Sequence, residues 1–296
     1  MFGWEYPPHI YGGLATANFG ITEGLHAQRD VDITLCLPHP FGDEDQSYCR
    51  IVVMNRVPIV WRDVDYGFVE QRLGGLMTPD YYYRLRDHIY ADFGHMNVNE
   101  LGAMEFAGGY PANLHEEINN YSIIAGVVAR TEDFDIIHAH DWLTYLAGIA
   151  AKELTGKPLV VHVHATSFDR GTEDQIDSRV YDIEKRGMMA ADKVIAVSDL
   201  TRNIVINKYG IDPEKVVTVH NAVDFSGREN VKVERGVRDK VVTFLGRITF
   251  QKGPEYFIEA AAKVLKRTKG VRFVMAGSGD MMNRCIRHVA KLGISD

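Results

Sequence analysis

The amino-acid sequence predicts an α/β fold built on parallel, doubly wound sheets. Short apolar segments alternate along most of the chain with longer amphipathic segments, which is typical of strands that pair in parallel through crossover helices. Residues 224–239 interrupt the alternation with polar sequence that has no hydrophobic period, and the pattern starts again beyond them. We therefore predict two domains, at residues 1–223 and 240–296, joined by a linker at residues 224–239.

The first predicted elements form a β-α-β unit. Residues 1–4 have the pattern of the end of a buried strand, so we expect the chain to begin within this element. A loop rich in proline and glycine ends at Gly12-Gly13, apolar residues at helical spacing predict a helix at 14–25, and residues 31–37 predict a strand. The G-x-G-x-x-G pattern is absent, so the loop lacks the dinucleotide-binding fingerprint.

The segment between residues 38 and 120 is less regular. Two apolar runs predict strands at residues 51–54 and 57–61, and an aromatic-rich stretch at 81–90 predicts a helix. Because an aromatic stripe at helical spacing more often packs into a core than binds sugar, we assign this helix to the core.

Regular alternation returns after residue 120. The remaining elements of the first domain are predicted as helices at 121–130, 142–154, 174–189 and 198–209 and strands at 135–140, 158–164, 193–197 and 216–220. The second domain is predicted to have strands at 241–245 and 271–276 and helices at 254–266 and 281–291. A doubly wound domain usually has about five or six strands, so the second domain is predicted to be incomplete.

Composition and charge restrict the class of protein. The 296 residues, 46% hydrophobic and 25% charged, are typical of a globular protein with sizeable cores. A net charge of −7 argues against nucleic acid as a partner. Cys36, Cys49 and Cys285 have neither metal-binding nor disulfide spacing, and no apolar run reaches the ~20 residues that span a bilayer. With no signal-peptide pattern, we expect a cytoplasmic protein without an integral membrane segment.

The stretch at residues 244–254, Phe-Leu-Gly-Arg-Ile-Thr-Phe-Gln-Lys-Gly-Pro, is the most informative local pattern. It joins a strand to a helix that begins at Pro254, where the missing N–H would be unpaired in any case. Helix N-termini bind phosphate, and Arg247 and Lys252 place two positive charges beside this one. Taken alone, the stretch fits a diphosphate site and an ordinary connection with solvated cations equally well.

Four histidines occupy the ends of two neighbouring predicted strands. His138 and His140 share one face of the first strand, and His162 and His164 repeat the spacing on the next. A metal could bind such a cluster, but no carboxylate or cysteine completes a ligand set, so we favour hydrogen-bonding roles. A histidine at the strand tip can bond a substrate hydroxyl, with Asp141 fixing its tautomer or bonding the ligand itself.

Two further loops carry weaker signals. Asn221 follows the last strand of the first domain, where ligand binding and turn formation explain it equally well. Ala-Gly-Ser-Gly-Asp at residues 276–280 is a second glycine loop between a strand and a helix, and its backbone N–H groups could line an anion site.

In combination these motifs resemble the retaining glycosyltransferases of the GT-B type in the large family GT4, which neighbours bacterial glycogen and starch synthases. The matching segments lie at residues 5–14, 135–142, 220–224, 246–253 and 276–280. Ala222 departs from the Asn-Gly-Val-Asp pattern of the family. The set is specific for family and fold and weak for the substrate.

The resemblance implies two Rossmann-like domains that face a cleft, with the nucleotide sugar bound by the C-terminal domain and the acceptor mostly by the N-terminal domain. It gives catalytic roles to His140, at the transferred sugar, and to Arg247 and Lys252, at the donor diphosphate. The other implied donor-binding residues are Gly12, Gly13, Asp141, His164, Asn221, Gly277, Ser278 and Gly279.

The implied reaction moves a sugar, with glucose expected, from an ADP-, UDP- or GDP-sugar to a glycan acceptor with retention of configuration. Negative charge develops on the departing phosphate, and two fixed cations would stabilise it. We therefore expect neither a metal nor another cofactor.

One departure from the family keeps alternatives open. The pair of glutamates eight positions apart, expected in the second domain, does not occur after Lys252. The chain as it stands could thus be inactive, a non-catalytic nucleotide-sugar or glycan-binding fragment. A metal-dependent hydrolase built on the four histidines is the other alternative. The sequence does not predict the oligomeric state.

Overall fold

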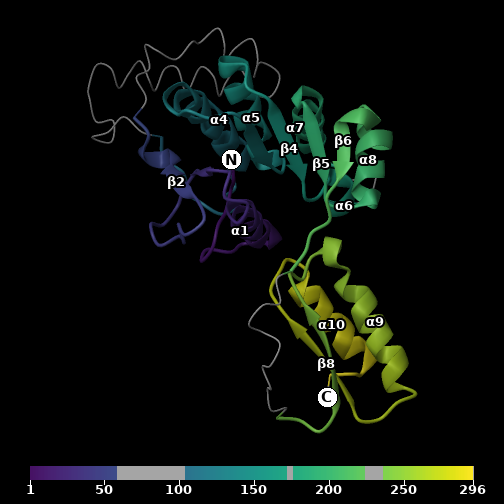
Figure 1. Ribbon diagram of the computed structural model, residues 1–296. Helices are drawn as coiled ribbons and strands as arrows, with labels where there is room; N and C mark the ends of the chain where they lie inside the picture. The colour runs from purple at the N-terminus through teal and green to yellow at the C-terminus, as the bar shows by residue number, and fades with distance from the viewer. Residues whose placement is uncertain (59–103, 172–175, 224–235, 296) are drawn as a thin grey trace. The chain divides into compact units, whose positions relative to one another are not determined.

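The structure is a computed structural model that describes residues 1–58, 104–171, 176–223 and 236–295 (Figure 1). It contains two compact units. The first comprises Met1–Ser167 and Asp177–Ala222, and the second comprises Phe168–Ile176 and Val223–Asp296. The strand predicted at 57–61 lies largely outside the described residues, and the aromatic helix predicted at 81–90 lies entirely outside them.

The first unit is built on a parallel sheet. Its strands are β1 (Thr34–Leu37), β2 (Arg50–Val53), β3 (Ile137–His140), β4 (Leu159–Val163), β5 (Lys193–Ala196) and β6 (Val216–Thr218). β1 pairs with β2, and β3 to β6 pair in chain order. Phe2 joins the two groups, because it bridges Cys36 of β1 and Ala139 of β3 in parallel. The strand end predicted at residues 1–4 therefore lies in the middle of the sheet.

The direction in which the sheet grows reverses at Phe2. The chain passes outward from Phe2 to β1 and β2, and then returns to place β3 on the other side of Phe2. Open α/β sheets bind ligands at such a reversal, beyond the carboxyl ends of the strands. The loop that ends at Gly12 and the turn at Asp141 follow the two strands that meet there.

Helices cover both faces of this sheet (Figure 1). Phe19 and Leu25 of α1 (Gly13–His26) pack against the buried cluster that contains Leu35 and Leu37 of β1. On the other face, α5 (Trp142–Thr155) packs on β3 and β4 and against α4 (Leu114–Thr131). The same face carries α7 (Ser178–Ala190), which packs on β4 and α5, whereas α8 (Asp199–Tyr209) packs on β5 and β6. Short helical turns are η1 (Met54–Arg56), α6 (Ser167–Arg170) and η4 (Pro213–Lys215).

The contact between α5 and the sheet fixes which way the strand residues point. A Cβ on Gly148 of α5 would lie 2.9 Å from Leu159 and 3.0 Å from Ala139, so these two residues face α5. Successive residues of a strand point to opposite faces. His138 and His140 of β3 and His162 of β4 therefore point to the opposite face, which carries α1.

Most predicted elements of the first unit are confirmed, and the largest differences concern helix starts. α4 begins at Leu114 rather than at residue 121, because its first turn carries acidic residues such as Glu117, which favour a helix N-terminus. α7 begins at Ser178 rather than at residue 174, because the Asp177 side chain accepts a hydrogen bond from the backbone and caps the helix there. Ser198 caps α8 as predicted.

The second unit repeats the pattern on a smaller scale. β7 (Lys240–Leu245) and β8 (Val271–Ala276) pair in parallel, and they are followed by α9 (Pro254–Leu265) and α10 (Met282–Leu292), with the short turn η5 (Phe250–Lys252) before α9. Ile248, Ile258, Met281 and Cys285 form its buried cluster. The strands and helices predicted for residues 241–291 are confirmed. Among the helices of the described residues, none is both long and apolar enough to cross a membrane.

Candidate functional site

The carboxyl ends of β3 and β4 bring two of the predicted site residues together. His140 ends β3, is 0% exposed, and pairs in register with His162 of β4. Its Nδ1 lies 3.1 Å from Nε2 of His164, which follows β4, and this distance is a hydrogen bond. The structure therefore places His140 and His164 as neighbours, as the sequence predicts.

Burial keeps these histidines uncharged. It lowers the pKa of His164 to about 4, and burial together with the neighbouring His164 lowers the pKa of His162 to about 3. Burial lowers the pKa of His140 well below its usual value, and the surrounding histidines add to the shift. A neutral imidazole has one N–H and one lone pair. One nitrogen of His140 faces His164, and its Nε2 has no hydrogen-bond partner among the described residues, so it can bond a ligand.

Asp141 connects the two strand ends through its backbone and its carboxylate. Its φ of 61° and ψ of 169° lie in a region that is essentially restricted to glycine, at a cost of ~1–3 kcal/mol. In this conformation Oδ1 accepts hydrogen bonds from the N–H groups of His164, at 3.0 Å, and Ala165, at 3.3 Å. Asp141 is one predicted candidate to fix the tautomer of His140. In the structure, the ring nitrogen of His140 that such a carboxylate would bond is hydrogen-bonded to the ring of His164 instead.

The glycine loop after the first strand is held by a carboxylate. Oε2 of buried Glu5 accepts hydrogen bonds from the N–H groups of Tyr11, at 2.7 Å, and Gly12, at 3.1 Å, and Oε1 accepts one from the hydroxyl of Tyr110. Burial raises the pKa of Glu5, and hydrogen bonds from the backbone of Tyr11, Gly12 and Ala15 and from the Tyr110 hydroxyl oppose that shift without cancelling it. Glu5 is not among the predicted site residues. A sequence pattern could have indicated this role: Glu5 is the single acidic residue between the apolar strand end at residues 1–4 and the glycine pair at which the helix begins.

The two glycines of this loop differ in their surroundings. A Cβ on Gly12 would lie 3.4 Å from Oε1 of Glu5, whereas a Cβ on Gly13 would have no atom within 4 Å. Gly13 is also the first residue of α1, whose N-cap Gly12 makes no side-chain hydrogen bond. The Glu5 carboxylate binds the N–H groups of Gly12 and Ala15 at this helix start. At Gly13 itself, no contact with a described residue requires a glycine.

Asn221 lies further along the same edge of the sheet. It is exposed and follows β6, so β5 separates it from the end of β4 that carries His164. The structure does not bring Asn221 into the group around His140.

In the second unit, two predicted loops pack directly on each other. The N–H of Ile248 donates a hydrogen bond to the carbonyl of Ser278 at 2.8 Å, and the N–H of Gly246 donates one to Ala276 at 3.0 Å. A Cβ on Gly277 would lie 1.9 Å from the carbonyl oxygen of Gly246. A Cβ on Gly279 would lie 2.3 Å from the carbonyl oxygen of Ile248. These glycines are required by the contact between the loops, whatever ligand the loops bind.

The loop after β7 presents positive charge at the start of α9. Gly253, in the left-handed conformation with φ of 62°, is the N-cap of α9 and makes no side-chain cap. Arg247 and Lys252 are exposed, and neither forms an ion pair with another described residue. Glu255, in the first turn of α9, binds Nε of Arg284 at 2.7 Å. The acidic residue nearest the helix N-terminus is thus already paired, and the two cations remain available to an anion.

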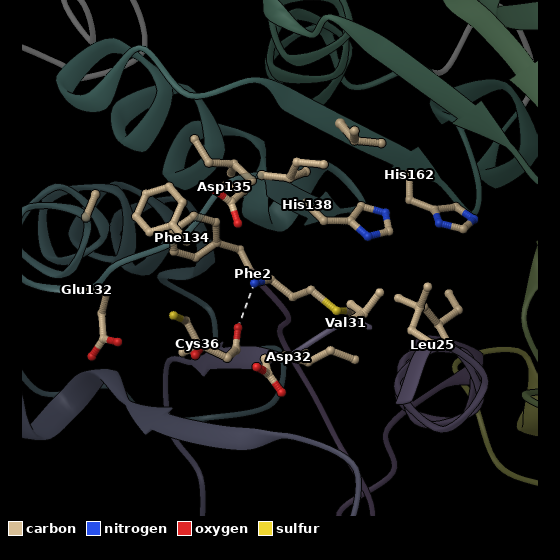
Figure 2. Close-up of a pocket in the computed structure, with 18 of the residues that line it drawn as sticks. Phe2, Leu25, Val31, Asp32, Cys36, Glu132, Phe134, Asp135, His138 and His162 are labelled. Atoms are coloured by element: carbon tan, nitrogen blue, oxygen red, sulfur yellow. Dashed lines mark hydrogen bonds between the residues drawn. The ribbon is translucent and has the colours of Figure 1, made fainter. Parts of the chain in front are cut away.

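The first unit also contains a cavity of about 920 Å³ (Figure 2). It is lined by residues that precede β1 and β3, such as Val31 and Phe134, by Leu25 of α1, and by His138 and His162. The cavity thus extends toward the amino ends of the strands. Because ligands of open α/β sheets bind at the carboxyl ends, we distinguish this cavity from the candidate site around His140.

Comparison with known proteins gives matches over both units. The family model described as Glycosyltransferase Family 4 matches residues 114–226, and the model described as Glycosyl transferases group 1 matches residues 227–296. An uncharacterized glycosyltransferase of Methanocaldococcus jannaschii is 29% identical over 296 residues, which cover 95% of this chain and 63% of that protein. Alpha-maltose-1-phosphate synthase of Mycolicibacterium smegmatis is 35% identical over 153 residues, 46% of this chain and 39% of that protein. The chain therefore spans less than two thirds of the length of these relatives.

Solved structures match the fold over the whole chain. Anabaena HepE, in complex with UDP and glucose, has a TM-score of 0.59 and 17% identity, with 100% of this chain and 67% of that chain covered. TarM of S. aureus, in complex with Fondaparinux, alpha-GlcNAc-glycerol and UDP, has a TM-score of 0.60 and 11% identity, with 99% and 76% covered. The fold is the GT-B fold of glycosyltransferases, as the sequence predicts.

Proposed function

Because the chain has the GT-B fold and matches two glycosyltransferase family models in succession, we propose that it is the part of a glycosyltransferase that binds the diphosphate and the sugar of a nucleotide-sugar donor. The enzyme would move a hexose, with glucose the first candidate, to a glycan acceptor with retention of configuration. Glucose and retention are supported by the resemblance of the motifs to those of the glycogen and starch synthases. The two parts would correspond to residues 1–223 and 240–296, with residues 224–239 between them.

The observation that carries this proposal is the open, positively charged start of α9. A helix N-terminus without a side-chain cap is suited to a diphosphate when two cations lie beside it that form no ion pair with a described residue. Glu255 is paired with Arg284 and does not offset their charge. In the transfer reaction the diphosphate departs with growing negative charge. Arg247 and Lys252 lie near the helix start and would stabilise that charge without a metal or another cofactor.

In the first unit, His140 would contact the transferred sugar. Its Nε2 is unpaired, its ring is held by His164, and the strained turn at Asp141 keeps the two strand ends together. Gly13 would let the N-terminal loop approach the donor, because a ligand can come close to a residue that has no side chain. The donor nucleotide is expected to be UDP, ADP or GDP; HepE in complex with UDP and glucose supports a uridine donor as the first to test.

The competing functions are less well supported. Matches to glycosyltransferase family models over residues 114–296 favour a transferase over a metal-dependent hydrolase. A non-catalytic binding fragment would keep the donor site and lack transfer, so donor binding and transfer have to be measured separately. The three cysteines are free and buried, which is consistent with the expected cytoplasmic location.

The test replaces each cation in turn. We expect Arg247→Ala and Lys252→Ala to lower transfer from UDP-glucose to glycan primers by ~100-fold, or roughly 3 kcal/mol of transition-state stabilisation. Lys263→Ala is the matched control, since it removes the same charge from the exposed last turn of α9. Wild-type transfer in either cation variant would refute the assignment.

Calorimetry with UDP-, ADP- and GDP-glucose measures donor binding by the same variants. Donor binding that depends on Lys252 without any detectable transfer would support the non-catalytic alternative over an enzyme. No binding of any of the three donors by the folded wild-type chain would contradict both.

A further inference from the structure

The side of β3 and β4 that faces α1 carries a compact group of imidazole rings. The ring centroids of His138 and His140 are 4.1 Å apart, those of His140 and His162 are 5.3 Å apart, and those of His138 and His162 are 5.5 Å apart. One ring nitrogen from each of the three lies within 4.8 Å of those of the others. Two residues of one strand and one of its neighbour fix this arrangement, because the strands hold the rings on the same face in register.

Four buried ring nitrogens of this group lack hydrogen-bond partners among the described residues. Nε2 of His138, Nε2 of His140 and both ring nitrogens of His162 are buried and have none among the described residues. A buried polar atom without a partner costs ~1–3 kcal/mol, so four such atoms in one group need an explanation. Burial also keeps the rings neutral, because it lowers the pKa of His162 to about 3 and the pKa of His138 well below its usual value. Neutral imidazole is the form that coordinates metals.

A bound ion could reach this group through the cavity of the first unit. Figure 2 shows the rings of His138 and His162 beside each other at the wall of the cavity of about 920 Å³. His140, whose ring centroid is 4.1 Å from that of His138, does not line the cavity, and its Nδ1 is hydrogen-bonded to His164. If Nδ1 donates in that bond, Nε2 of His140 carries the lone pair that a metal requires, as in the second shell of many histidine sites.

We propose that His138, His140 and His162 bind one divalent transition-metal ion, with Zn²⁺ as the representative. Zn–N bonds of ~2.0–2.1 Å require ligand nitrogens ~3.3 Å apart, so binding would draw the rings closer by up to ~1.5 Å. A solvent molecule from the cavity can complete a tetrahedral set of ligands.

The site has a consequence for His140 that rests on the proposed function. The metal would occupy Nε2 of His140, the atom that the transferred sugar would need. An occupied site is therefore expected to inhibit transfer, and to do so without weakening the diphosphate contacts of the second unit.

The test measures zinc binding directly, by equilibrium dialysis of the whole chain against Zn²⁺ followed by elemental analysis. We expect one zinc per chain, and affinity at least ~100-fold weaker in His138→Phe and in His162→Phe, since even second-shell changes cost up to that much. His9→Gln is the matched control. His9, with Asp43 and Glu44, forms the other group of ligand-type side chains that lie close enough together among the described residues.

A second measurement needs no substitution. Zn²⁺ added to the wild-type chain should shift the NMR signals of the ring nitrogens of these three histidines, and a chelator should reverse the shift. No zinc binding by the wild-type chain, or binding that His9→Gln removes and His138→Phe leaves intact, would overturn the proposal. These measurements involve neither donor nor acceptor, so their outcome tests the metal site independently of whether the protein transfers a sugar.

Discussion

Replacing Gly279 with alanine should destabilise the second unit strongly. The new Cβ would lie 2.3 Å from the carbonyl oxygen of Ile248 and 2.6 Å from its carbonyl carbon. Both are backbone atoms, so no rotamer change can relieve the contact. The loop that contains Gly279 has to move away from the loop that follows β7.

The cost can be estimated from what that movement breaks. Overpacking of a tight contact costs ~1–3 kcal/mol. Moving the loop also weakens two hydrogen bonds, from the N–H of Ile248 to Ser278 at 2.8 Å and from the N–H of Met281 to Ile248 at 3.1 Å. At about 1 kcal/mol for each hydrogen bond, the total loss is about 3–5 kcal/mol.

Hydrogen exchange detected by mass spectrometry is the appropriate assay, because it reports on each unit of the same chain. Peptides from α9 and α10 should exchange ~100-fold faster or more in Gly279→Ala, whereas peptides from α4 and α5 serve as the internal reference. Gly236→Ala is the matched control in the same unit, since a Cβ there has no atom within 4 Å. Unchanged exchange of α9 in Gly279→Ala would refute the argument that the fold itself requires this glycine.

Three further substitutions test other contacts. Gly13→Ala should abolish donor binding in calorimetry. Its stability should be unchanged or slightly raised, because an added Cβ meets no atom within 4 Å and alanine favours the helix that begins there. The control Gly20→Ala, where a Cβ in α1 has equal space, should bind the donor normally. Gly187→Ala should cost ~1–3 kcal/mol in urea unfolding, because its Cβ would lie 2.3 Å from the buried ring of Tyr145; an unchanged midpoint would contradict this. Tyr121→Phe should cost ~1–2 kcal/mol in the same assay, since its buried hydroxyl donates hydrogen bonds to the carbonyls of Cys36 and Gly3, and full stability would mean that these bonds contribute nothing.

The sequence predicts those parts of the fold that depend on local pattern. Strand β4 and helix α5 follow from an apolar run and from an amphipathic period, and α5 ends within one residue of its predicted end, where Gly156 with φ of 69° is the C-cap. The pairing of His140 with His164 follows from alternation on two parallel strands that end at the same edge. These features need only the period of the sequence and the rule that consecutive strands of such folds lie side by side.

Periodicity and strand adjacency do not predict contacts between segments that are distant in the sequence. The strained conformation of Asp141 is imposed by the link between β3 and β4, and aspartate has no local preference that predicts it. Likewise, Glu5 acquires a role only because the loop folds back and places the N–H groups of Tyr11 and Gly12 on its carboxylate. Both the Asp141 conformation and the Glu5 hydrogen bonds depend on which distant segment packs beside them. The local sequence around either residue does not predict that packing.

The glycines of the candidate site show why this difference matters for function. Sequence reasoning places Gly13, Gly277 and Gly279 in one class, because each lies in a loop between a strand and a helix. The structure separates them: Gly277 and Gly279 are needed by backbone contacts within the fold, whereas no contact with a described residue explains Gly13. Loss of activity in Gly279→Ala would therefore say nothing about the donor. Loss of donor binding in a stable Gly13→Ala would, so Gly13 is the glycine at which a role in donor binding can be measured apart from stability.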